Sequence, residues 1–165
     1  MFLSFVSAFG GGVVRDLLVG TTPFIFTEMY PLLVSLCIVV ISLFFKLPVV
    51  QKLEHSKLFV LSDSIGLSIF AYTGSSIGMH YDFNFMGVVF LGLLTATGGG
   101  IFRDVMIQKT PYIFKEDFYG TVAIIVGILT FFFGMYPITI IIIGVLLRIL
   151  AVKFKWKLPK TLREN

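Results

Sequence analysis

An arginine followed directly by an aspartate occurs at two places in this sequence, and these side chains are the ones best suited to bind a charged solute. Each pair follows three consecutive glycines in an apolar stretch: Gly10, Gly11, Gly12, Arg15 and Asp16, then Gly98, Gly99, Gly100, Arg103 and Asp104. A guanidinium can receive a carboxylate, and an aspartate can receive an ammonium group. Charged side chains inside apolar segments are costly, so we expect a functional or a pairing role for these.

The two stretches are copies of one sequence unit. Residues 10–26 and 98–114, aligned at an offset of 88, agree at nine of seventeen positions. The matches include the glycines, the arginine, the aspartate and a Thr-Pro pair, none of which is a generic apolar residue. We therefore interpret the pattern as an internal duplication and not as a chance similarity of helix composition.

The elements that carry these residues are predicted to be apolar helices. Hydrophobic residues make up 57% and charged residues 13% of the 165 positions, with a mean hydropathy of +0.99. Soluble domains have roughly 45–50% apolar and about 25% charged residues. A membrane-spanning helix needs about 20 residues. The sequence predicts an all-α integral membrane protein in the lipid bilayer, with six transmembrane helices at about 1–20, 29–45, 58–79, 84–108, 118–135 and 137–152.

Basic residues give the predicted orientation. Lysines occur in the loops 46–57 and 109–117, whereas the loops 21–28 and 80–83 have no lysine or arginine. The positive-inside rule then assigns the basic loops and the C-terminus to the cytoplasm. Residues 148–165 hold six basic side chains and one acidic side chain, a net charge of +5. We expect this basic end to lie against anionic lipid and not to bind nucleic acid.

In this topology the two copies have opposite orientations, because the first ends in an outer loop and the second in an inner loop. Inverted repeats place a substrate pathway at their interface, commonly lined by broken helices. The helix at 58–79 has no counterpart before the first copy, so either the start codon is assigned too far downstream or the chain is a truncated form. The predicted units are an incomplete first repeat at 1–45, a second repeat at 58–135, a final helix at 137–152 and a basic cytoplasmic tail at 153–165.

The glycine triplets have two interpretations. They break a helix that lines a wet pathway, or they allow helices to pack closely. Their polar neighbours, Thr95 and Thr97 among them, favour the break. Asp63 lies as deep in its helix as Arg103 does, from the same side, and is the expected partner of that arginine; the alternative is that Asp63 caps its own helix.

No catalytic constellation is recognisable. His55 and His80 lie in loops without other metal ligands, and Cys37 has no second cysteine to pair with. A Ser-His-Asp arrangement, a phosphate-binding loop and a nucleotide motif are absent from the sequence. We expect no enzyme activity, no metal and no cofactor.

A family resemblance rests on DSIGLSIFAYTG at 63–74, TATGGGIFRD at 95–104 and Thr-Pro at 110–111. These motifs resemble the bacterial glycine transporter family, formerly an uncharacterised inner-membrane family, over nearly the whole chain. That family is similar to the trimeric intracellular cation channels, which have two inverted triple-helix repeats plus a last helix. The resemblance implies this fold, a homotrimer in the bacterial inner membrane, transport of glycine or small monovalent ions, and pathway roles for Asp63, Gly66 and Gly74 beside the two motif copies.

Three functions remain open at this point. The first is a transporter in which an arginine and a helix N-terminus receive the carboxylate of a small zwitterion, while an aspartate or backbone carbonyls receive its ammonium group. The second is a monovalent cation channel gated by the glycine-containing helices. The third is a membrane assembly protein whose glycines serve helix packing alone.

Overall fold

The fold is entirely helical over the part of the chain that the structure describes. The structure is a computed structural model, and it describes residues 2–44, 57–115, 118–154 and 156. The helices are α1 (Phe2–Val19), α2 (Phe24–Thr27), α3 (Met29–Phe44), α4 (Lys57–His80), α5 (Phe85–Met106), α6 (Tyr112–Lys115), α7 (Tyr119–Phe133) and α8 (Pro137–Lys153). The six long helices match the predicted segments to within two residues at each end. Most of the predicted tail at 153–165, and the loop at 46–56, lie outside the described residues.

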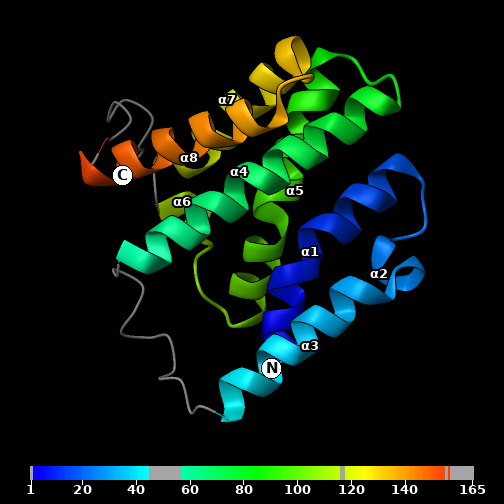
Figure 1. The fold of residues 1–165 in the computed structure, drawn as a ribbon, viewed down its shortest axis with the longest axis vertical. Helices are drawn as coiled ribbons and strands as arrows, with labels where there is room; N and C mark the ends of the chain where they lie inside the picture. Colours follow the sequence, from blue (N-terminus) through cyan, green and yellow to red (C-terminus); the bar gives the residue numbers. More distant parts are fainter. Residues whose placement is uncertain (1, 45–56, 116–117, 155, 157–165) are drawn as a thin grey trace.

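Four helices form the core. Figure 1 shows α7 and α8 beside α4, with α5 behind α4. One cluster of buried apolar side chains comes from α4, α7 and α8, and α5 packs Leu93 and Ala96 against it; its members are Leu67, Ala71, Val122, Ala123, Val126 and Ile140. Glycines let the helices approach: a methyl group on Gly144 would lie 2.6 Å from Cγ2 of Val126, and one on Gly127 would lie 3.1 Å from Cα of Val89. Close contact of small residues holds helices together where hydrophobic exclusion from water is not available.

Buried hydroxyl groups in this core are largely satisfied within their own helices. Ser68 donates to the carbonyl of Ser64 at 2.8 Å, Thr95 to Leu91 at 2.6 Å, and Thr130 to Val126 at 2.8 Å. A serine or threonine hydroxyl in a helix reaches the carbonyl four residues earlier. The hydroxyls therefore enter an apolar core without leaving these donors unpaired.

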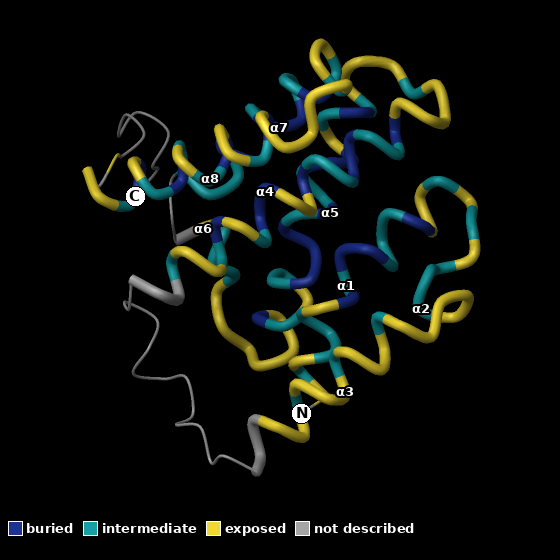
Figure 2. Tube along the Cα trace, viewed as in Figure 1, coloured by how far each residue is buried: buried dark blue, intermediate teal, exposed yellow. Residues whose placement is uncertain are grey.

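Helix α3 lies apart from this core, at the opposite side of the molecule from α7 and α8 (Figure 1). It packs on α2, and its described side chains from Met29 to Ile41 are all exposed or half-exposed. Figure 2 shows α3 as exposed along most of its length, in contrast to the buried crossing of α1, α4 and α5. The exposed side chains are mostly apolar, as expected for a surface that meets lipid.

Two described helices are long and apolar enough to cross a membrane, Phe2–Val19 and Phe85–Met106. Met29–Ile41 and Tyr119–Phe133 are shorter apolar helices. The six predicted crossings, the predicted domain limits and the cytoplasmic orientation of the C-terminus thus stay predictions.

Candidate functional site

The first arginine–aspartate pair ties the end of α1 to the short helix α2. Arg15 Nη2 lies 2.7 Å and Nε 2.8 Å from Oδ1 of Asp16. The other carboxylate oxygen, Oδ2, accepts the backbone N–H of Phe24 at 2.8 Å. Charge-assisted bonds of this kind are about twice as strong as neutral ones. Asp16 therefore both neutralises its neighbour and fixes where α2 begins.

The second pair repeats this geometry at the end of α5. Arg103 Nε lies 2.9 Å from Oδ1 of Asp104, and Oδ2 of Asp104 accepts the N–H of Tyr112 at 2.9 Å. Residues 24 and 112 are separated by the same 88 positions as the pairs themselves. The duplication seen in the sequence is thus a duplicated structural unit, and in both copies the aspartate is the anchor.

The backbone turn between the pair and the short helix is also duplicated. The N–H of Thr21 bonds to the carbonyl of Asp16, and the N–H of Lys109 bonds to the carbonyl of Asp104, both at 2.9 Å. The residue before each donor has a left-handed backbone, with φ of 80° at Gly20 and 54° at Gln108. This is the usual geometry for ending a helix and reversing the chain.

Helices α1 and α5 cross at the glycine triplets and run antiparallel there. A methyl group on Gly10 would lie 3.1 Å from Cα of Gly99, and one on Gly98 would lie 3.3 Å from Cα of Gly11. A methyl group on Gly11 would overlap the carbonyl oxygen of Thr95, and one on Gly99 would overlap that of Ser7. Residues early in α1 contact residues late in α5, and the reverse. Each contact also has an equivalent: shifting its two residues by 88 positions, one forward and one back, gives another observed contact. The crossing therefore has an approximate two-fold axis.

The expectation of broken helices is wrong. Both α1 and α5 are continuous helices through their triplets. The bare backbone of Gly10, Gly11, Gly98 and Gly99 lies against the partner helix, which is the packing interpretation. Removing the Cβ atoms lets the two helices touch, and that contact offsets the poor helix propensity of glycine.

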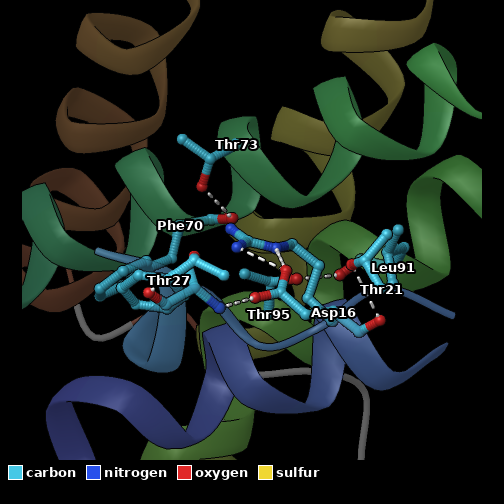
Figure 3. A network of polar contacts seen from close by, with 9 residues as sticks. Asp16, Thr21, Thr27, Phe70, Thr73, Leu91 and Thr95 are labelled. Atoms are coloured by element: carbon cyan, nitrogen blue, oxygen red, sulfur yellow. Dashed lines mark hydrogen bonds and ion pairs between the residues drawn. The ribbon is translucent and has the colours of Figure 1, made fainter. Parts of the chain in front are cut away.

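The other predicted glycines have varied surroundings. Gly12 lies under the ring of Phe24, and Gly74 of α4 faces Thr95, so that Thr95 is wedged between α1 and α4. A methyl group on Gly66 or Gly100 would meet no heavy atom within 4 Å. Figure 3 shows the first unit, with Asp16 at the end of α1, together with Thr95 of α5 and Thr73 of α4. The four packed glycines thus gather at the crossing and the two arginine–aspartate pairs lie at the helix ends, whereas Gly66 makes no such close contact.

The predicted pairing of Asp63 with Arg103 is wrong. Arg103 forms its ion pair with Asp104, the next residue in the chain. Asp63 accepts a hydrogen bond from the hydroxyl of Tyr119 at 3.2 Å. Two residues at the same depth can lie on different faces of the bundle, whereas the carboxylate of the next residue in the chain is within reach of Arg103 in any fold.

Arg148 belongs to the basic end of the chain but is buried. It is 2% exposed, and its Cζ lies 4.9 Å from the ring centre of Tyr119 and 5.9 Å from that of Tyr112. A signal for its burial was present, because Arg148 shares one helical face with Ile140, Gly144 and Ala151. Arg148 and the two tyrosines are therefore additions to the candidate site.

The chemistry that this arrangement offers is charge recognition within an apolar protein. Two guanidinium groups lie at the two ends of the helix crossing, each with a carboxylate beside it. Among the described residues no group of three or more histidine, cysteine, aspartate or glutamate side chains could hold a metal ion. Guanidinium donors are suited to planar carboxylates.

The all-helical fold with its apolar exterior is typical of a membrane protein. The chain belongs to the glycine transporter family, which it matches over residues 1–47 and 60–135. It is 33% identical to the UPF0126 membrane protein YvgT of Bacillus subtilis (strain 168), over 95% of this chain and 79% of that protein. It is 28% identical to the UPF0126 inner membrane protein YadS of Escherichia coli (strain K12), over 100% of this chain and 84% of that protein.

Solved structures similar to this fold are TRIC channels. One, from work on conductance through TRIC cation channels, superimposes with a TM-score of 0.79 at 33% identity, covering 98% of this chain and 82% of that one. A prokaryotic TRIC channel in 0.5 M KCl gives a TM-score of 0.81 at 29% identity, covering 93% of this chain and 81% of that one. The resemblance to both families inferred from the motifs is confirmed.

Proposed function

We propose that this protein moves a small zwitterion, glycine or a close analogue, across the membrane along the crossing of α1 and α5. The observation that carries the proposal is the pair of matched arginine–aspartate units at opposite ends of an antiparallel crossing. Each unit can present a guanidinium to a carboxylate, and backbone carbonyls or an aspartate can receive the ammonium group. A solute that leaves one unit meets a chemically equivalent one at the other end.

The proposed topology is an inverted repeat in a six-helix chain with a cytoplasmic C-terminus. The antiparallel contacts of α1 with α5 support the inversion, and the basic loops support the orientation. In inverted-repeat transporters, one repeat rocks against the other around a central site. We further propose a homotrimer in the bacterial inner membrane, supported by the similarity to TRIC channels, one of which is titled a trimeric intracellular cation channel orthologue.

A monovalent cation channel is the second candidate, and a specific observation favours it. The chain superimposes on TRIC cation channels over nearly its full length at 33% identity. In that function the glycine crossing would act as a gate, and the aspartates would offset the charge of the arginines near the permeating ion. The third candidate, a membrane assembly protein, is favoured by the close packing of Gly10, Gly11, Gly98 and Gly99.

Reconstitution of the 165-residue chain in proteoliposomes separates these functions. Saturable uptake of labelled glycine supports the transporter, an unsaturated potassium current supports the channel, and neither supports the assembly protein. Arg103→Ala is expected to lower glycine uptake at least tenfold at an unchanged yield of folded protein. Lys109→Ala is the matched control, because this exposed side chain lies near the same helix end and is outside the proposed pathway. Normal uptake by Arg103→Ala would reject the role of the arginine.

A further inference from the structure

The aromatic residue that follows each Thr-Pro pair takes different positions in the two units. The ring of Phe24 lies on Gly12, 5.9 Å from the ring of Phe9, with Cζ of Arg15 5.6 Å from its centre. Tyr112 is the equivalent of Phe24, but its ring leaves the equivalent of Gly12 uncovered, since a methyl group on Gly100 would meet no heavy atom within 4 Å. The first unit is thus covered by its aromatic ring and the second is not.

Tyr112 instead lies against α7 and α8. Its ring meets that of Tyr119 edge-on at 5.3 Å, and Nη2 of Arg148 donates to its hydroxyl at 3.4 Å. The first unit offers no such partners, because residue 31, the equivalent of Tyr119, is Pro31 and α8 lies outside the repeat. The different partners account for the different side-chain positions.

The main chain makes the same turn, the same aspartate hydrogen bond and the same short helix in both units, so a side-chain rotation is the change that would exchange one position for the other. In each unit the aromatic residue begins a four-residue helix and donates its N–H to the aspartate. The aspartate therefore holds the backbone of residue 112 while χ1 and χ2 remain the variables. Rotations between staggered side-chain positions need no refolding of the chain.

The arginine is shielded from solvent in the unit whose glycine is covered by the aromatic ring, and it is accessible in the other unit. The side chain of Arg15 is 13% exposed and that of Arg103 is 38% exposed, although the two carboxylates are equally buried at 8%. The first unit is therefore shielded and the second accessible in one and the same conformation. Inverted-repeat transporters expose their two ends in turn.

We propose that Tyr112 is a two-position side chain that controls access to Arg103, with Arg148 as the residue that holds it open. In the position seen here, Arg148 and Tyr119 keep the ring away from Gly100. In the other position the ring lies on Gly100 and shields Arg103, as Phe24 lies on Gly12 and shields Arg15. The inference rests on the proposed pathway for its meaning, and on the geometry of residues 24, 100, 112 and 148 for its evidence.

Thiol labelling tests the two positions without measuring transport. Cys37 is replaced by serine, Gly100→Cys is introduced in the full chain, and its modification by a small water-soluble maleimide is timed in membranes. Arg148→Leu is expected to slow the labelling at least fivefold, because the released Tyr112 ring covers position 100. Tyr112→Phe should slow it as well, since it removes the hydroxyl to which Arg148 donates but keeps the ring. This milder change serves as the second variant if Arg148→Leu does not fold.

Two controls make the result specific. Lys153→Leu removes a positive charge from an exposed position of α8 and should leave the labelling rate unchanged. In a Tyr112→Ala background, neither partner change is expected to alter the rate, because no ring is left to move. Labelling that is unchanged by both Arg148→Leu and Tyr112→Phe, or slowing that persists in the Tyr112→Ala background, would overturn the inference. Because the readout is a labelling rate, it can fail while glycine uptake stands, and it can succeed while uptake fails.

Discussion

Helices α3 and α7 follow the two arginine–aspartate units at equivalent positions in the sequence but have opposite surroundings. Helix α7 packs against α4, α5 and α8 and buries five residues, Val122, Ala123, Val126, Gly127 and Thr130. Helix α3 packs on α2, and none of its described side chains is buried. The long helix α4 packs against both α5 and α7, which also contact each other, whereas the described helix that packs against both α1 and α3 is the four-residue α2.

The difference separates what is local in this fold from what depends on neighbours. The arginine–aspartate pair, the left-handed turn and the short helix form in both units, although the long helix that follows is buried by its neighbours after one unit and exposed after the other. Each of these contacts joins residues within nine positions in the chain. The docking of the third helix differs, because it needs side chains from another helix. The arginine–aspartate unit is thus a local structure, and its two copies show the same structure in two different environments.

Loss of the aspartate should have the largest effect and should distinguish the two environments. Asp16→Ala leaves Arg15 with its shielded charge unpaired and removes the acceptor of the Phe24 N–H, so we expect a loss of about 3–5 kcal/mol in the free energy of unfolding. Asp104→Ala should cost less, about 1–3 kcal/mol, because Arg103 is accessible to solvent or headgroups. Reversible denaturant titration in mixed micelles measures both. An equal or larger loss for Asp104→Ala would contradict the role of shielding.

Equivalent glycine substitutions on the α1 side and on the α5 side of the crossing should destabilise the protein equally. Gly11→Ala and Gly99→Ala each drive a methyl group into a carbonyl oxygen of the partner helix, and overpacking costs about 1–3 kcal/mol. The two-fold axis predicts that the losses agree within the error of the titration. Gly66→Ala is the matched control for stability, since a methyl group there meets open space. Unequal losses would show that the two geometrically equivalent contacts contribute differently to the free energy of unfolding.

The sequence predicted what depends on neighbouring residues along the chain. Helix ends followed from apolar run lengths and from turn residues such as Pro137, and the duplicated unit followed from its own identities. The partners of Asp63 and Arg148 did not follow, because they depend on which helix faces come together. The continuous helices at the glycines were missed for the same reason, since a glycine triplet reads as a break until the helix packed against it is known.

Because Phe24 covers Gly12 and no ring covers Gly100, the same substitution at these two equivalent positions should change the free energy of unfolding in opposite directions. Gly12→Ala places a methyl group against the Phe24 ring, so we expect it to destabilise by about 1 kcal/mol or more. Gly100→Ala meets no atom and should stabilise by up to about 1 kcal/mol, because alanine is the better helix former. The same titration measures both variants. A destabilising Gly100→Ala would mean that the Tyr112 ring occupies that space for much of the time.

The smallest expected effect lies at the left-handed residue of each turn. Gly20 adopts φ of 80° without a steric cost, whereas Gln108 holds φ of 54° with a side chain. The left-handed region costs a residue with a Cβ roughly 1–2 kcal/mol, and glycine also gains entropy in the unfolded chain. Gln108→Gly should therefore stabilise by less than about 1 kcal/mol, and Gly20→Ala should destabilise by about the same amount. If Gln108→Gly destabilises the chain instead, the Gln108 side chain makes a contact that outweighs its strain, and the two turns are equivalent in geometry but not in energy.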